Sequence, residues 1–161
     1  MSNRLSLALL VAVLGVAAFA GVTLATAPSG VTNTAIGAGN LPPTNLNIKT
    51  GDWKLDLRTK GDSDVSVTES RVGPGGNFGW HSHPGPSLSI VKSGTLTFYR
   101  GDDPTCTPTV YQTGDVLIDP GGTVHIGRNE GSVDLVLVVT RLVPDGAATR
   151  IDEPNPGNCP F

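Results

Sequence analysis

Three histidines are the residues of this chain best suited to chemistry. His81 and His83 are two positions apart, so on a β-strand both side chains project from the same face. His125 follows a glycine-containing turn that could return it to the same place from another strand. Neutral imidazoles are common ligands of divalent transition metals, and the pattern therefore indicates a metal site. The alternative is an exposed His-x-His pair together with a histidine at 125 that has only a structural role.

The residues around the first two histidines have a distinctive spacing. Gly75 is followed by five residues and then by His81 and His83, which have one residue between them. Ser87 comes after three further residues, and Gly94 after six more. This order resembles the first conserved motif of the cupin superfamily, in which a metal-binding Glu usually stands where this chain has Ser87.

The stretch around the third histidine resembles the second cupin motif at every fixed position. Gly114 is followed by five residues and Pro120, then by Gly122, by His125 after two residues, and by Asn129 after three. The 19 residues between the two motifs suit the short connections of small, mostly bacterial cupins. The resemblance covers residues 52–142 and implies an all-β fold, a single-domain cupin-type jelly-roll β-barrel, with a small-molecule ligand or substrate.

Carried onto this sequence, the resemblance implies the metal ligands His81, His83 and His125 and no fourth protein ligand. Imidazoles alone do not select the ion, so Fe, Zn, Mn, Ni and Cu all remain compatible. Three neutral ligands leave the +2 charge of the ion uncompensated, which favours anionic ligands. Among cupins, such sites resemble those of iron dioxygenases that act on thiols or diketones, whereas sites that keep the Glu resemble those of manganese oxalate-degrading enzymes.

Other side chains could contribute to such a site. Asp119 stands just before Pro120 and serves either as a turn cap or as a residue that orients His125. The Gly-x-Ser-x-Gly elbow of serine hydrolases is missing around Ser87, which argues against that chemistry. The side chains that could pair with a substrate carboxylate or line the pocket, although each also suits a surface or core position, are Arg71, Arg128, Arg141, Tyr99 and Trp80.

The composition favours strands and turns over helices. The chain has 161 residues, of which 21 are Gly and 13 are Pro, and short apolar stretches alternate with polar residues between these turn formers. In the stretch 133–142, one face is apolar and the other carries Val136 and Val138 beside Asp134, which predicts a strand covered on both sides. The net charge is −3 and the basic residues are scattered, which argues against binding to nucleic acid.

The first 27 residues are predicted to direct export. Residues 5–27 follow Arg4 and carry no charge, as in a secretory signal peptide with cleavage after Ala20 or Ala27. Because about 20 apolar residues suffice to span a bilayer, an uncleaved membrane anchor is the alternative. Residues 28–50 are predicted to form a linker or extended arm, which two copies of the chain could exchange in a homodimer. The remaining parts are a cupin barrel over 51–143 and a Pro-rich C-terminal tail over 144–161.

The two cysteines agree with export. Cys106 and Cys159 could form a disulfide, because such bonds persist in oxidising compartments; the alternative is two unpaired thiols. We therefore expect an exported metal-binding cupin, secreted, periplasmic or in the cell envelope. Its three-His site would act on a small anionic substrate as a dioxygenase-like oxidoreductase. The alternative is a non-catalytic cupin that binds a small ligand or metal outside the cytoplasm.

Overall fold

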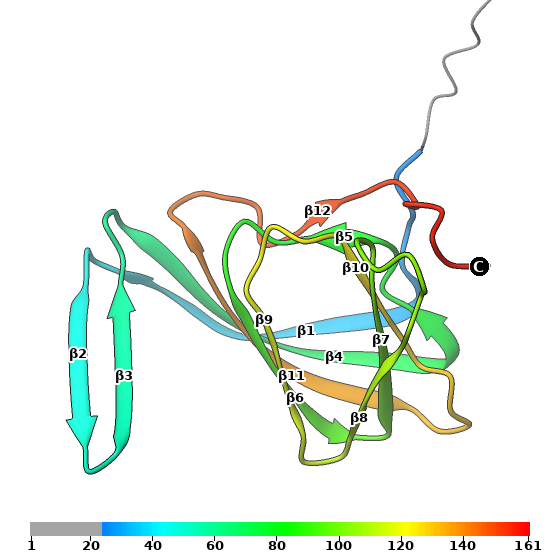
Figure 1. Ribbon diagram of the computed structural model, residues 1–161, viewed down its shortest axis with the longest axis horizontal. Helices are drawn as coiled ribbons and strands as arrows, with labels where there is room; N and C mark the ends of the chain where they lie inside the picture. The colour runs from blue at the N-terminus through cyan, green and yellow to red at the C-terminus, as the bar shows by residue number, and fades with distance from the viewer. Residues whose placement is uncertain (1–23) are drawn as a thin grey trace, which may run out of the picture.

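The computed structural model describes residues 24–161. In this part of the chain every secondary-structure element is a β-strand. The expected all-β fold is thereby confirmed. Ten strands form one antiparallel sheet that curls into a nearly closed barrel, and two strands form a separate sheet (Figure 1). The strands are β1 (Ser29–Leu41), β2 (Asn45–Thr50), β3 (Trp53–Arg58), β4 (Ser63–Asn77), β5 (His81–Ser82), β6 (Ser87–Ser93), β7 (Thr95–Arg100), β8 (Thr109–Gln112), β9 (Val116–Asp119), β10 (His125–Arg128), β11 (Leu135–Pro144) and β12 (Ile151–Asp152).

Strands that are far apart in the sequence are neighbours in the barrel. β4 and β11 pair antiparallel along the whole of β11, the other edge of β11 pairs with β6, and β6 pairs with β9. β10 pairs with β4, β5 and β7. The two histidine-bearing strands β5 and β10 are consequently adjacent, with His125 opposite His81 in their register.

Residues 29–41, which the sequence assigned to a linker or extended arm, form the strand β1. This strand pairs with β4 from Ser29 opposite Asn77 to Leu41 opposite Ser63. Nearly all of its side chains are exposed, and they are mostly small or polar, so hydrophobic alternation does not reveal the strand. Its contribution is made by the backbone, which pairs with the edge of β4 that would otherwise be open.

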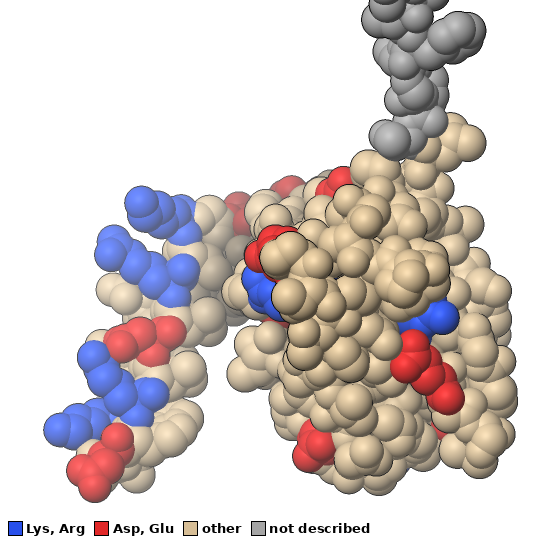
Figure 2. Space-filling view, turned by 45° about the vertical axis from the view of Figure 1, so that its right-hand side comes forward, with Lys and Arg blue, Asp and Glu red and all other residues tan. Residues whose placement is uncertain are grey.

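β2 and β3 form a hairpin that projects from the barrel (Figure 1). The barrel expected from residue 51 onward therefore excludes residues 53–58 and includes the earlier strand β1. The cross-strand pairs Leu46–Leu57 and Ile48–Leu55 place apolar side chains on one face of the hairpin. Lys and Arg side chains, with Asp and Glu side chains between them, gather over the same projecting part (Figure 2), so the hairpin has an apolar and a charged face.

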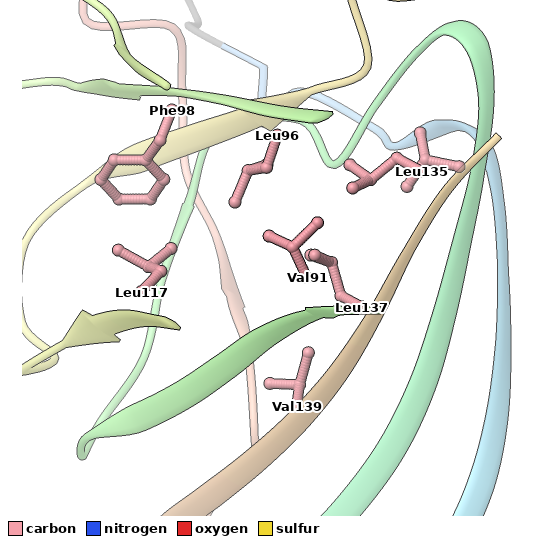
Figure 3. Packing of buried hydrophobic residues seen from close by; sticks show 8 residues of the cluster. Val91, Leu96, Phe98, Leu117, Leu135, Leu137 and Val139 are labelled. Atoms are coloured by element: carbon pink, nitrogen blue, oxygen red, sulfur yellow. The ribbon is translucent and has the colours of Figure 1, made fainter. Parts of the chain in front are cut away.

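The main core lies between the strands of the barrel (Figure 3). On β11 the alternate residues Leu135, Leu137 and Val139 contribute to it, whereas Val133 precedes the strand and is exposed. Val136, on the opposite face of β11, is also buried, in keeping with a strand covered on both sides. The cluster consists of Val72, Val91, Leu96, Phe98, Leu117, Leu135, Leu137 and Val139.

The C-terminal segment is folded against the barrel. Cys106 and Cys159 form a disulfide, and Cys159 packs with Trp80, Tyr99 and Ile126 in a second buried cluster. β12 adds to the barrel sheet by pairing with β5. The residues expected as a Pro-rich tail thus cover the end of the barrel that holds the histidines.

The first described residues reach the same end of the barrel. The Thr26 N–H donates to the Glu153 carbonyl at 3.0 Å, and the Thr26 hydroxyl accepts from the Trp80 N–H at 2.5 Å. The predicted export segment lies outside the described residues apart from positions 24–27. In the described part of the chain, no helix has the length and apolar character needed to cross a membrane.

Candidate metal centre

The three histidines meet inside one end of the barrel, as their spacing predicted. His81 lies on β5, His83 follows it after one residue, and His125 begins β10. Each is at least nine-tenths buried. The centroids of the rings are 4.3 Å apart for His81 and His125, 4.9 Å for His81 and His83, and 5.2 Å for His83 and His125.

Each imidazole is oriented by a hydrogen bond between its Nδ1 atom and a backbone carbonyl. A carbonyl oxygen only accepts hydrogen bonds, so each Nδ1 carries the proton and each Nε2 keeps a free lone pair. This arrangement fixes the tautomer that a metal-binding histidine needs. The acceptors are the carbonyl oxygens of Gly79 for His81 at 2.8 Å, Thr149 for His83 at 2.7 Å and Thr123 for His125 at 2.9 Å.

The donor set fits a divalent metal ion. The three imidazoles offer ligand atoms that all lie within 4.8 Å of one another. Nitrogens bound to one ion at about 2.1 Å lie at most about 4.2 Å apart, so small side-chain movements would bring the set to bonding distance. Among the described residues, His81, His83 and His125 are the group of histidine, cysteine and carboxylate side chains that meets this criterion.

Burial keeps these histidines neutral. It lowers the pKa of His81 to about 2, with a further contribution from His125 nearby. Burial also lowers the pKa of His83 to about 4 and moves that of His125 in the same direction. A metal binds only the unprotonated nitrogen, so near neutral pH the site does not have to lose protons before it takes an ion.

The histidines face a small cavity. The centre of a water molecule can occupy about 40 Å³ of it, which is room for an ion with a few small ligands since one water needs roughly 10–15 Å³ on this measure. The aromatic rings of Phe78 and Phe98 and core aliphatic residues form much of the wall. The polar side chains that line it are His81, His83, Ser87, Ser89, Asp119, His125 and Arg141.

Asp119 belongs to this cavity more closely than its place in the sequence suggests. Its Oδ1 accepts a hydrogen bond from the Gly121 N–H at 3.1 Å, which is the expected turn cap. Its Oδ2 lies 3.8 Å from His125 Nδ1 and 3.9 Å from His83 Nε2. The alternation on β9 puts Asp119 on the same inward face as Leu117, but the apolar run before it hides that alternation in the sequence.

Of the remaining candidate residues, only Arg141 lines the cavity. Its Nε atom is buried without a hydrogen-bond partner among the described residues, and burial lowers its pKa. Arg71 is instead paired with Asp134 at the surface, and Arg128 is paired with Glu130. The other two candidates, Trp80 and Tyr99, pack in the second hydrophobic cluster.

Sequence reasoning missed Arg150, which lies in the segment expected to be a tail. Its Nη2 atom is buried without a hydrogen-bond partner in the described part of the chain. Its positive charge contributes to lowering the pKa of both His81 and His125. Nothing in a Pro-rich terminal sequence signals this position, because it depends on the pairing of β12 with β5.

Comparison with known families agrees with the motifs. The cupin domain family, Cupin_2, matches residues 68–141, a range that runs from β4 to β11 and contains all three histidines. The barrel has the antiparallel arrangement that this family implies. This match supports membership of the chain in the cupin superfamily.

Individual relatives are distant. The chain is 26% identical over 90 residues to the auxin-binding protein ABP19b of Prunus persica, covering 55% of this chain and 43% of that protein. It is 30% identical over 69 residues to ABP19a of the same species, covering 42% of this chain and 33% of that protein. The chain thus spans less than half of each curated relative. A cupin domain structure from Bordetella pertussis is 21% identical with a TM-score of 0.48, covering 71% of this chain and 94% of that one.

Proposed function

We propose that this protein is an exported, metal-dependent cupin that binds a small anionic substrate at its three histidines and acts as a dioxygenase-like oxidoreductase. The observation that carries the proposal is the orientation of the imidazoles. All three Nδ1 atoms are bonded to backbone carbonyls, which leaves three Nε2 lone pairs beside one cavity. Such preorganisation serves ligation, because it leaves the three Nε2 atoms unprotonated.

The charges around the cavity favour an anion as the ligand. Neutral imidazoles would leave the full +2 charge of a divalent ion available to further ligands. Arg141 lines the cavity with a buried Nε that has no partner among the described residues, and a guanidinium pairs well with a carboxylate. The modest cavity, about 40 Å³ for water centres, favours a substrate whose reacting end is small.

A bound divalent ion would supply Lewis acidity and, if it were iron, the redox chemistry needed to activate dioxygen. The residues of the chain would provide binding and exclusion of water. Arg141 would hold the anionic group, and the rings of Phe78 and Phe98 would keep the cavity walls apolar. Low polarity strengthens every charge interaction at the site.

Export is supported by two features. Residues 5–27 contain no charged side chain after Arg4, and Cys106 and Cys159 are joined in a disulfide. Disulfides of this structural kind persist in oxidising compartments. Export is tested by expressing the full chain and determining the N-terminal residue of the product. A cytoplasmic product with reduced cysteines would contradict export.

The metal proposal is tested by elemental analysis of the exported full chain, purified without chelator and without an affinity tag that contains histidines. We expect near-stoichiometric metal in the native protein and none in the His81→Ala/His83→Ala variant. Iron would direct oxygen-uptake assays toward thiols, diketones and small carboxylates. No metal after purification and none taken up on reconstitution would refute the proposal. Ligand-induced stabilisation without turnover would support the non-catalytic alternative.

The anion-binding role of Arg141 has its own test. Acetate titrated into the Co²⁺-loaded protein should perturb the cobalt absorption spectrum. A hydrogen bond to a charged group contributes roughly 1.5–3 kcal/mol, so Arg141→Gln should weaken acetate binding by about 10-fold or more while Co²⁺ affinity changes little. Equal acetate affinity in Arg141→Gln and native protein would contradict this role. Arg128→Gln, which changes the charge outside the cavity, is the matched control.

A further inference from the structure

Asp119 is a buried carboxylate with half of its hydrogen-bonding capacity unused. Only 4% of the residue is exposed. Oδ1 accepts from Gly121 N–H, but Oδ2 has no hydrogen-bond partner among the described residues. A buried carboxylate oxygen without a donor is unfavourable, and a bound cation is one of the few groups that would satisfy it.

The position of Asp119 in the sheet relates it to the missing Glu of the first cupin motif. In the pairing of β6 with β9, Asp119 is directly opposite Ser87, and both line the cavity. Directly opposed residues of an antiparallel pair have Cβ atoms about 4.5–5.5 Å apart. The small Ser87 side chain leaves space, so a carboxylate from the neighbouring strand can enter the region that a Glu at 87 would fill.

The distance from Asp119 to His83 is compatible with sharing an ion, whereas on the His125 side Oδ2 lies 3.8 Å from Nδ1, the atom that bonds the Thr123 carbonyl. Oδ2 of Asp119 lies 3.9 Å from His83 Nε2, and two ligands at about 2.1 Å from one six-coordinate ion lie about 3–4.2 Å apart. Asp119 is not a member of the set whose ligand atoms all lie within 4.8 Å of one another. Ligation therefore requires the carboxylate to turn inward, and Oδ2, which has no hydrogen-bond partner within residues 24–161, is free to do so.

We propose that Asp119 is the fourth protein ligand of the metal ion, with the carboxylate moved from β6 to the facing position on β9. The inference rests on the proposed metal site. It changes the expected ligand set from three histidines to three histidines and one aspartate. The net charge of the loaded centre would then be +1, as in cupins with the Glu, and Arg141 would become the main attraction for an anionic substrate.

The test measures Co²⁺ binding to the metal-free full chain and the visible absorption of bound Co²⁺. Asp119→Asn keeps an oxygen for the Gly121 N–H and removes the anionic ligand. We expect its Co²⁺ affinity to fall by about 100-fold or more, beyond the roughly 10–100-fold loss typical of partners outside the coordination sphere, with a changed spectrum. Asp115→Asn, an exposed residue with the same charge change, should bind Co²⁺ as the native protein does.

A second variant restores the carboxylate on the other strand. Ser87→Glu in the Asp119→Asn background should recover most of the lost affinity, because a carboxylate again faces the three histidines. Native affinity in Asp119→Asn, or a weakened affinity with an unchanged Co²⁺ spectrum, would overturn ligation by Asp119. Failure of the native chain to bind Co²⁺ would instead overturn the metal site itself. Near-ultraviolet circular dichroism of each metal-free variant checks that the fold is retained.

Discussion

Acidification should destabilise the metal-free protein, because the fold holds its histidines neutral. Burial lowers the pKa of His81 to about 2 and that of His83 to about 4, whereas both are about 6.5 in an unfolded chain. Below pH 6.5 the unfolded state therefore binds more protons than the folded state. The contribution of these neutral histidines to the free energy of unfolding is fully present above pH 6.5. It is lost as the pH falls toward their pKa values in the folded protein.

The magnitude follows from the width of that window. Each group with such a shift changes the free energy of unfolding by about 1.4 kcal/mol per pH unit. At pH 5, about 1.5 units below the pKa of an unfolded histidine, His81 and His83 together should lower the free energy of unfolding by about 4 kcal/mol. His125, whose pKa burial also lowers, acts in the same direction. The loss is comparable with much of the roughly 5–15 kcal/mol by which domains are stable.

Urea unfolding of chelator-treated protein at pH 7.5, 6 and 5, followed by tryptophan fluorescence, measures this effect. With a urea dependence of about 1–3 kcal/mol per molar, the midpoint should fall on the order of 2 M between pH 7.5 and 5. The carboxyl groups whose pKa the fold lowers, those of Glu69, Asp102 and Asp103, have ordinary values near 4 and titrate mainly below this window.

The reasoning would be refuted if the midpoint moved by less than about 0.5 M over this pH range. His83→Gln supplies the internal control, since it removes one of the titrating groups and keeps a polar side chain in the cavity. Its stability should depend on pH less steeply than that of the native protein. An unchanged slope would show that the acid sensitivity arises elsewhere.

Two further perturbations test the scaffold. A Cys106→Ala/Cys159→Ala variant removes the disulfide, which closes a loop over a sequence separation of 53 residues. This should lower the free energy of unfolding by about 4 kcal/mol. A loss below about 1 kcal/mol in urea titrations would contradict the expectation. Gly121 has a φ of +87° and a Cβ there would lie 2.6 Å from the Gly85 carbonyl oxygen, so Gly121→Ala should cost roughly 2–4 kcal/mol. Gly122 has a φ of +73° but open space, so Gly122→Ala should cost only about 1–2 kcal/mol; equal melting temperatures for the two variants would argue against the clash.

The sequence was most informative where spacing and backbone periodicity act together. Residues two apart on a strand share a face, which places His81 and His83 side by side, and the turn before His125 returns that residue to them. Two cysteines in one domain leave a single intramolecular pairing, so the disulfide could also be predicted. The histidine positions depend on local backbone geometry, and the disulfide depends on the number of cysteines. Each can be evaluated before the fold is known.

The features that the sequence did not reveal depend on long-range pairing. β1 has few large side chains, and only its hydrogen bonds to β4 make it a strand. The sequence suggests that Asp119 caps a turn or orients His125, but its position opposite Ser87 follows only from the pairing of β9 with β6. The charge of Arg150 acts on His81 and His125 because β12, which follows it, pairs with β5. In each case a partner strand from a distant part of the chain decides the environment.

The folding of the C-terminal segment over the histidines has a consequence for the biogenesis of the protein. The carbonyl that orients His83 belongs to Thr149, which is separated from it by 66 positions in the chain. His81 and His83 therefore leave the ribosome well before the group that fixes one of their rings. A metal encountered at that stage would meet an incomplete centre. We expect stable binding of the metal only after the C-terminal segment has been synthesised and the disulfide between Cys106 and Cys159 has formed. Metal binding would then be one of the last steps in the maturation of the protein.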